Sequence, residues 1–280
     1  MAISIGERIF FAAVAALALW VGAWGAFLPQ HVDWALPWIV PPLHARFLGA
    51  MYLSGAVFML GAVFARRWSA IRVVVPMCAI WTGLLLVVSL LFLPEFDWRK
   101  QQVWIWFAAY TVFPLGATLI AWRHRRDASA GPGAALPASL RVYLRVQGAI
   151  VLVLAAALFF APAAMASRWP WAITPLLAQL YSAPFCSFGA GGLLAARQRT
   201  LYDVRLYLLA TFTFALGVLL ASTVHRALFS ADQLSDLLWF AGFAVATLAL
   251  GAGSVLALLP APAGGGLAPD GVTLQNAPGT

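Results

Sequence analysis

Long apolar stretches, separated by short polar segments, run along almost the whole chain. Eight of them have the length of roughly 20 residues that a helix needs to cross about 30 Å of hydrocarbon. They fall near residues 8–28, 44–65, 71–93, 102–122, 141–162, 174–196, 203–225 and 236–259. The pattern therefore predicts an all-α membrane protein with eight transmembrane helices.

The same pattern occurs twice, in a register that aligns Phe27 with Phe160 and Arg72 with Arg205 without a gap. We call this displacement, an offset of 133 in residue number, the repeat offset. Over this alignment 13 of 46 positions are identical, against roughly a tenth for unrelated apolar sequence. The matches include the dipeptides Pro37-Trp38 and Pro170-Trp171. This internal repeat predicts two tandem four-helix units, and an even number of helices in each gives both units the same orientation in the membrane.

The repeat and its connecting segments divide the chain into four parts. We expect a first four-helix transmembrane unit at 1–126, a cytoplasmic linker at 127–138, a second four-helix transmembrane unit at 139–259 and a cytoplasmic tail at 260–280. The linker and the tail are rich in Gly, Pro and Ala without an apolar period, which is typical of disordered segments. The first apolar stretch is similar to a signal peptide, but its repeat partner lies in mid-chain, so we expect it to be retained.

The composition excludes an ordinary soluble domain. Hydrophobic residues make up 63% of the chain and charged residues only 9%, whereas about a quarter of the residues of a soluble domain are charged. The chain therefore belongs in a lipid bilayer.

The basic residues gather on one side of the predicted membrane. The net charge of +8 would indicate a nucleic-acid partner in a soluble protein, but here the distribution follows the positive-inside rule. The side of the N-terminus holds Arg8, Arg66, Arg67, Arg72, Arg123, Arg125, Arg126, Arg141, Arg145, Arg197, Arg199 and Arg205, and the opposite side holds Arg46, Arg99, Lys100, Arg168 and Arg226. We therefore expect a multi-pass protein of a bacterial inner (cytoplasmic) membrane with both termini in the cytoplasm. Its expected partners are the bilayer and other membrane subunits, and no nucleic acid.

A loop rich in Trp and Pro precedes the second helix of each unit. Tryptophan favours the headgroup level, and proline suits the first turn of a helix. We interpret these loops as interfacial elbows that seat the helices, with a lid over a cavity as the alternative. Their residues are Trp34, Pro37, Trp38, Pro42, Trp169, Pro170, Trp171 and Pro175.

The second of these loops resembles a known pattern. Trp169-Pro170-Trp171, a short apolar gap and Thr174-Pro175-Leu176 are similar to a WPW/TPL motif, followed by A-R, of uncharacterised multipass membrane proteins of high-GC bacteria. The second unit departs from this motif at Gln179, where the first unit has Arg46. The resemblance implies no activity, cofactor or catalytic residue.

Polar residues at which the two units differ form the candidate binding site on the outer face. They are His44, Arg46, Gln179, His225 and Arg226. Two histidines at one membrane face could hold a metal ion or a haem, or exchange protons near neutral pH. Their spacing fits no metal-binding motif, so ordinary interfacial histidines remain the simpler interpretation, and no metal site is predicted.

The sequence indicates a function only by class. It has no nucleotide-binding or hydrolase motif, so we expect no catalytic residue, and it does not indicate a cofactor. No Asp or Glu lies near the middle of a span, which disfavours a cation-coupled transporter.

We therefore expect a non-enzymatic accessory or scaffold subunit. The alternative is a transporter or binding protein for a neutral or lipophilic small molecule at the interface of the two repeats, with Arg46 and Gln179 lining one opening. A further alternative is a haem or metal protein that uses His44 and His225.

Overall fold

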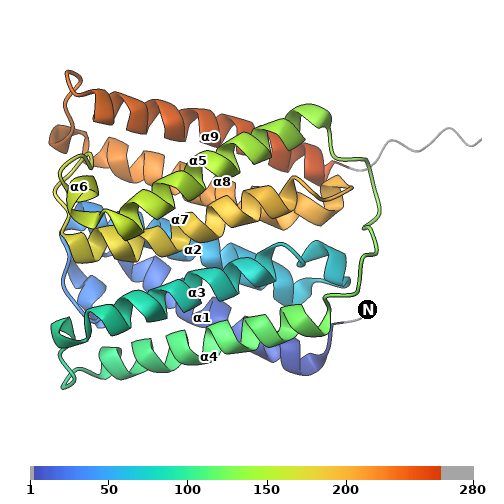
Figure 1. Ribbon diagram of the computed structural model, residues 1–280, viewed down its shortest axis with the longest axis horizontal. Helices are drawn as coiled ribbons and strands as arrows, with labels where there is room; N and C mark the ends of the chain where they lie inside the picture. Colours follow the sequence, from blue (N-terminus) through green and yellow to red (C-terminus); the bar gives the residue numbers. More distant parts are fainter. Residues whose placement is uncertain (1–2, 260–280) are drawn as a thin grey trace, which may run out of the picture.

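The computed structural model describes residues 3–259, and they form a bundle of long helices that run side by side (Figure 1). Within these residues only an isolated bridge between Ala135 and Thr200 has β pairing, so the all-α prediction is confirmed. The predicted tail at 260–280 lies outside the described residues. The long helices are α1 (Ile5–Phe27), α2 (Pro42–Phe64), α3 (Val74–Leu91), α4 (Gln101–Arg123), α5 (Ala138–Phe160), α7 (Pro175–Ala195), α8 (Leu201–Val224) and α9 (Leu234–Leu258).

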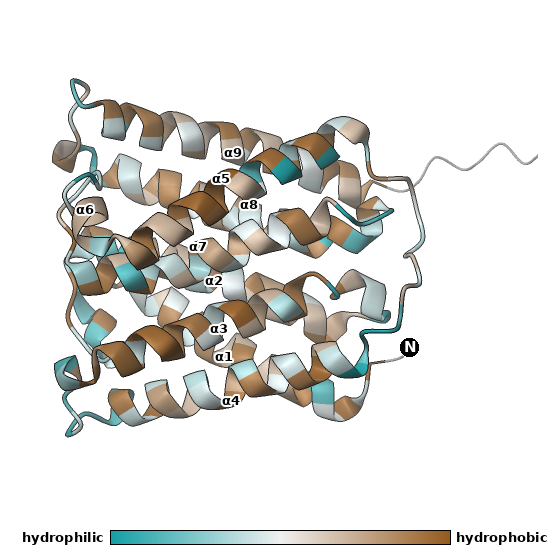
Figure 2. Cartoon of the chain, viewed as in Figure 1, coloured by the Kyte–Doolittle hydropathy of each residue, from teal (hydrophilic) through white to brown (hydrophobic). Residues whose placement is uncertain are grey.

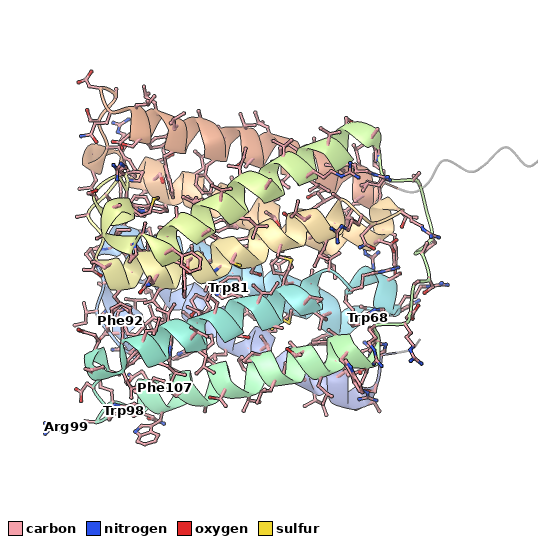
Figure 3. The ribbon with its side chains drawn as sticks, in the orientation of Figure 1. Trp68, Trp81, Phe92, Trp98, Arg99 and Phe107 are labelled. Carbon is pink, nitrogen blue, oxygen red and sulfur yellow. The ribbon has the colours of Figure 1, made fainter. Side chains whose placement is uncertain are left out.

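Short helices lie in the turns at both ends of the bundle. We call the end at which α1 begins the N-terminal end, and the opposite end the far end. The far end carries η1 (Pro29–Trp34), η3 (Leu93–Glu95), α6 (Pro162–Ala166) and η4 (Arg226–Leu228), and η2 (Trp68–Ala70) lies at the N-terminal end. In Figure 3 Trp68 is accordingly at one end, and Trp98 and Arg99 are at the other.

Seven of the described helices, all except α7 among the long ones, are long and apolar enough to cross a membrane. Hydrophilic residues gather at the two ends of the bundle, and hydrophobic residues fill the length between them (Figure 2). The chain is therefore a multipass membrane protein. Helix α7 lies inside the bundle, where 13 of its 21 residues are buried, against five of 25 in α9. Its Ser and Gly residues face other helices, a position in which small and polar residues assist helix packing.

The first and second halves of the chain interlock. Helix α1 packs along α2 and α5 along α7, while α3 pairs with α4 and α8 with α9. Across the halves α2 packs on α8 and α3 on α7, whereas α2 and α3, which are consecutive in sequence, make little contact. The two units, 1–126 and 139–259, share one buried core. They are therefore separate repeats in the sequence but not separate domains in the fold.

Glycines allow the backbones of α1 and α2 to touch. A Cβ atom added to Gly49 would lie 2.3 Å from the backbone nitrogen of Ala26, and one added to Gly25 would lie 2.6 Å from the carbonyl oxygen of Ala45. No side chain fits in either place. Close approach through small residues is how helices associate where lipid offers no hydrophobic contrast.

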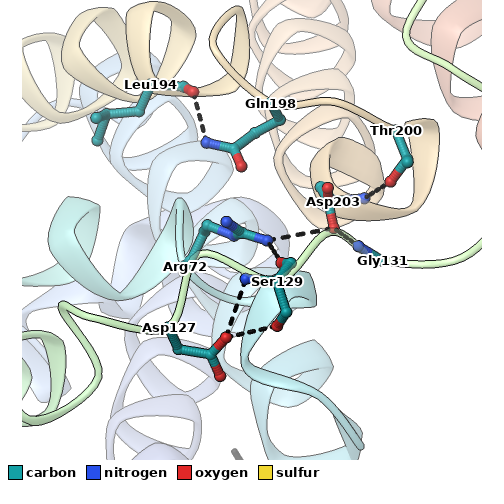
Figure 4. Close-up of polar contacts among 8 residues, drawn as sticks. All are labelled: Arg72, Asp127, Ser129, Gly131, Leu194, Gln198, Thr200 and Asp203. Atoms are coloured by element: carbon teal, nitrogen blue, oxygen red, sulfur yellow. Dashed lines mark hydrogen bonds and ion pairs between the residues drawn. The ribbon is translucent and has the colours of Figure 1, made fainter.

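The linker is held against the bundle, which corrects the expectation that it is disordered. The carboxylate of Asp203, at the start of α8, accepts a hydrogen bond from the Gly131 N–H (2.8 Å) and lies 3.8 Å from the Arg72 guanidinium. Arg72 also donates to the carbonyl of Ser129 (Figure 4). Two backbone hydrogen bonds join residues 134 and 136 to residues 201 and 199. Composition did not reveal this order because the partners come from distant helices.

Candidate binding site

The two Trp–Pro loops turn their rings into the bundle at the far end. Trp169 and Trp171 are 8% and 7% exposed, and Trp38 packs on Trp106 at 5.1 Å between ring centroids. These three rings pack on protein, and their place at the headgroup level stays a prediction. The aromatic partners that draw them inward come from other helices. Trp34, by contrast, is 55% exposed, as an interfacial residue would be.

The prolines of these loops behave as expected at the helix starts. Pro42 and Pro175 are the first residues of α2 and α7, where the missing N–H removes no helical hydrogen bond. The Thr174 hydroxyl caps α7 by accepting from the Leu177 N–H (3.2 Å). Pro37 is buried and Pro170 half-buried inside the loops. The prediction that proline opens both helices is therefore confirmed.

One polar contact of the far end occurs in both halves. The indole of Trp106 donates to the Ser89 hydroxyl (2.8 Å), and the indole of Trp239 donates to the Ser222 hydroxyl (2.9 Å). Both partners of the second contact follow those of the first at the repeat offset. Each serine thus satisfies a buried indole that lipid could not satisfy.

Replacing either serine by alanine should lower stability by a similar amount. Ser89→Ala and Ser222→Ala each leave a buried indole N–H unpaired, which costs about 1 kcal/mol. Ser54→Ala is the control, because the buried Ser54 hydroxyl has no hydrogen-bond partner among the described residues. Thermal unfolding of the purified variants measures the three effects. Unequal losses in the two halves, or an equal loss for Ser54→Ala, would contradict this equivalence.

Two residues of the predicted outer-face site meet across the halves. Arg46 of α2 lies 2.6 Å from the His225 ring, between Nη1 and Nε2. Arginine can only donate, so Nε2 of His225 accepts and the ring is neutral, with its proton on Nδ1. Burial, and next the positive charge of Arg46, lower the pKa of His225 below its ordinary value. The contact joins α2 to the end of α8.

The Arg46–His225 contact should weaken as the pH falls. The pKa of His225 is lower in the folded chain than in the unfolded chain, so the unfolded chain binds the proton first as the pH falls. The contact therefore makes its full contribution to the stability of the fold above the ordinary pKa of about 6.5. That contribution is lost as the pH drops below this value. The apparent melting temperature of the wild type should therefore fall toward that of His225→Gln between about pH 7.5 and pH 5. A difference that stays constant over this range would contradict the pairing.

The other predicted outer-face residues have different surroundings. His44 is 5% exposed and its Nδ1 lies 2.9 Å from the Tyr181 hydroxyl, so it is a core residue. Gln179 donates to the carbonyl of Phe159 (2.8 Å), and Arg226 is exposed. The five residues thus do not converge on one site. We expected Arg46 and Gln179 to line the opening of a cavity, but neither residue lines either of two cavities in the bundle.

A cavity lies inside the first half, between α1, α2, α3 and α4. It measures about 50 Å³. Apolar side chains form most of its wall, and Ser187 of α7 is the one lining residue from the second half. Between the halves, aromatic rings occupy much of the space, and Trp81 of α3 lies 5.6 Å from Phe188 of α7 between ring centroids. The cavity is therefore displaced from the interface of the repeats, where we expected it.

The polar groups around the cavity satisfy one another. The hydroxyls of Tyr52 and Tyr110 are hydrogen-bonded together. Thr82 donates to the Cys78 carbonyl (2.6 Å), and Ser187 donates to the carbonyl of Met77 (2.9 Å). No Asp, Glu, Lys, Arg or His of the described chain lines the wall. The site can therefore accommodate a neutral apolar group, whereas a charged one would be buried there without a partner.

A second, smaller cavity of about 20 Å³ adjoins the first toward the far end. Leu177, Leu180 and Pro184 of α7 contribute to its wall, so it lies between the halves. Tyr52 and Trp81 line both cavities, and their rings lie 6.0 Å apart. These two side chains therefore separate the two spaces.

The sequence analysis missed several residues that the structure brings together. Tyr52 was not singled out, and it is 58 positions from its partner Tyr110, so no local spacing indicates the pair. At the N-terminal end the Glu7 carboxylate lies 3.1 Å from His124 Nε2, and both side chains are buried. In the sequence, Glu7 is one charged residue near a helix start. Such a residue can as well be a determinant of membrane topology, so the sequence does not indicate that it pairs with His124.

The histidines do not form a shared ligand set. His44 is directed to Tyr181 and His225 to Arg46. The described residues contain no group of three or more His, Cys, Asp or Glu that could hold a metal ion. These side chains therefore do not fit the haem or metal alternative.

Comparison with protein families, with curated proteins and with solved structures gives no match to this chain.

Proposed function

We propose that this membrane protein binds a neutral lipophilic molecule, whose apolar part enters the cavity between α1, α2, α3 and α4. The observation that carries the proposal is a cavity in the bundle with an apolar wall and hydroxyls that are already paired. Ligand sites are typically apolar hollows with a few placed polar groups. The Tyr52 and Tyr110 hydroxyls are bonded to each other, so an apolar segment beside them leaves no hydroxyl of this pair without a partner.

The size of the cavity limits the ligand. A cavity that holds a single water molecule has a volume of about 10–15 Å³, and this cavity has a volume of about 50 Å³. It therefore accepts a short segment of an acyl or isoprenoid chain, with the rest of the ligand extending outside. Repacking of the partly exposed Leu17 and Phe113, which line it, would enlarge the space.

The ligand would enter from the bilayer between α1 and α4. These two helices make few contacts with each other. Phe10 of α1 packs on Phe113 of α4 at 6.0 Å between ring centroids, nearer the N-terminal end. Leu17 lies two turns farther along α1 and is partly exposed. A lateral entrance of this kind suits a molecule that is dissolved in lipid.

Solvent extraction of the purified protein tests the proposal. Protein isolated from its native membrane in mild detergent should yield a non-phospholipid lipophile at about one molecule per chain, identified by mass spectrometry of the extract. The detergent micelle contributes lipids of its own, so a second membrane protein prepared in parallel is the control. Extracts of the two proteins that do not differ would contradict the proposal.

We further propose that all eight long helices span an inner membrane as two tandem, like-oriented units, with both termini in the cytoplasm. Helix α5 begins and ends at the repeat offset from α1, and η4 begins and ends at the same offset from η3. The Trp–Ser contacts shared at that offset support the same architecture. Reporter fusions placed before α1, after Arg126 and after Leu259 should all report the cytoplasm. A periplasmic signal after Leu259 would mean that α7 or another helix does not cross.

An accessory-subunit role is the second candidate. Helix α9 is the observation that favours it, since only five of its 25 residues are buried and a Cβ atom added to Gly242 would meet no atom within 4 Å. Gly242 thus has no packing partner among the described residues, and another subunit could supply one. Recovery from native membranes as a lone monomer would argue against this role.

A further inference from the structure

Five exposed arginines gather at the N-terminal end of the first half. Two follow α2, and three lie at the end of α4 and just beyond it: Arg66, Arg67, Arg123, Arg125 and Arg126. We call them the arginine cluster. Two carboxylates lie nearby, Glu7 and Asp127, and both have other contacts. Two negative charges do not fully neutralise the five positive charges of the cluster.

A buried contact between two turns brings the cluster together. The ring of Trp68 stacks on the ring of His124 at 4.5 Å, with 15° between their planes. His124 is also bound to the buried Glu7 carboxylate, and Arg123 lies 3.7 Å from the same carboxylate. Since Trp68 follows Arg67 and His124 lies between Arg123 and Arg125, the stack holds the two arginine groups side by side.

The second half has no counterpart of this arrangement. At the repeat offset from residues 123–126, the end of α9 reads Leu256, Ala257, Leu258 and Leu259, and the equivalent of Glu7 is Leu140. Only Arg66 has an arginine at the matching position, Arg199. The second half also holds five arginines on this side, Arg141, Arg145, Arg197, Arg199 and Arg205, as the positive-inside rule requires, but none at the positions that match the end of α4. The cluster and the buried pair that supports it are therefore a particular feature of the first half.

Large apolar side chains lie directly beside the cluster. Phe64 is 76% exposed, Trp122 59% and Leu119 56%. The guanidinium of Arg125 lies over the Trp122 ring, 4.1 Å from its centroid. Exposed aromatic and aliphatic side chains next to guanidinium groups are typical of the boundary between hydrocarbon and headgroups. The cluster therefore adjoins the apolar surface of the bundle, as a site for lipid phosphates would.

We propose that the arginine cluster binds the phosphate of an anionic phospholipid, whose acyl chains cover Phe64, Leu119 and Trp122. Arginine matches phosphate oxygens with a planar fork of donors. The adjoining apolar surface selects a lipid over a soluble phosphate. The site lies at the end of the bundle and is separate from the cavity, so it does not depend on the ligand proposed above.

A charge-removal experiment tests the site. The variant Arg66→Gln/Arg67→Gln/Arg126→Gln removes three exposed guanidinium groups for which the described residues give no hydrogen bond or ion pair. The matched control Arg145→Gln/Arg197→Gln/Arg199→Gln removes three exposed arginines from the same end in the second half. Native mass spectrometry in detergent follows the binding of phosphatidylglycerol and of phosphatidylcholine with identical acyl chains. Each arginine near an anionic surface contributes about fivefold in affinity, so the first variant should lose roughly a hundredfold.

The expected result has three parts. The wild type binds phosphatidylglycerol more tightly than phosphatidylcholine, the cluster variant loses that preference, and the control variant keeps it. Equal losses in the two variants would overturn the proposal, because the effect would then come from net charge alone. Displacement of phosphatidylglycerol by glycerol phosphate at equal concentration would overturn it too, because the site would then belong to a soluble phosphate.

Discussion

A leucine in place of Gly49 is expected to abolish the folded protein. The first side-chain atom would lie 2.3 Å from the backbone nitrogen of Ala26, and a backbone cannot yield as a side chain can. Helices α1 and α2 would have to separate along their contact, at a cost of about 3 kcal/mol or more. Size-exclusion chromatography of detergent-solubilised protein should show loss of the monodisperse peak.

The same substitution at Gly242 is the matched control. A Cβ atom there meets no atom within 4 Å, so Gly242→Leu should elute as the wild type does. Gly49→Leu and Gly242→Leu each put one leucine in place of a glycine in a long helix. They differ only in the free space around the new side chain. A monodisperse Gly49→Leu protein with wild-type stability would show that α1 and α2 do not cross as described.

Gly55→Leu is expected to remove the lipophilic ligand and leave the fold intact. A Cβ atom at Gly55 would meet Trp81 at 3.7 Å and Ala18 at 3.9 Å, which are ordinary contacts. Gly55, Trp81 and Ala18 all line the cavity, so the remaining leucine atoms would occupy it. We expect the amount of extracted ligand to fall at least about tenfold, since a filled cavity no longer offers an apolar space.

The interpretation of that variant requires two further measurements. Gly55→Leu should melt at or above the wild-type temperature, because filling an apolar cavity adds contacts. Gly242→Leu should retain the ligand. If Gly55→Leu kept the ligand at full occupancy, the cavity would not be its binding site.

The features that could be predicted from the sequence are those set by long repeated patterns. The apolar stretches located each long helix to within a few residues, and Pro42 and Pro175 marked the starts of α2 and α7. Helix α7 has a lower hydropathy than the other seven long helices, although 13 of its 21 residues are buried. A pattern of apolar residues does not distinguish a helix that faces lipid from one that faces protein.

The site could not be predicted because it depends on which helices are neighbours. Cross-half packing of α2 on α8 and of α3 on α7 brings Arg46 to His225, 179 positions away. It also turns Trp169 and Trp171 inward, although Trp and Pro in a loop favour a place at the membrane surface. The positions at which the repeat is broken indicated Arg46 and His225, but they did not indicate the cavity around Tyr52 and Tyr110.

Photo-crosslinking tests the proposed lipophile site most directly. A fatty alcohol with a diazirine near the end of its chain is added to the purified protein, irradiated, and located by peptide mass spectrometry. We expect labelling on cavity-lining segments of α1, α2 and α4, around Leu17, Gly55 and Phe113, and loss of that labelling in Gly55→Leu. Labelling spread over the exposed faces of α5 and α9, with no excess at the cavity, would contradict it.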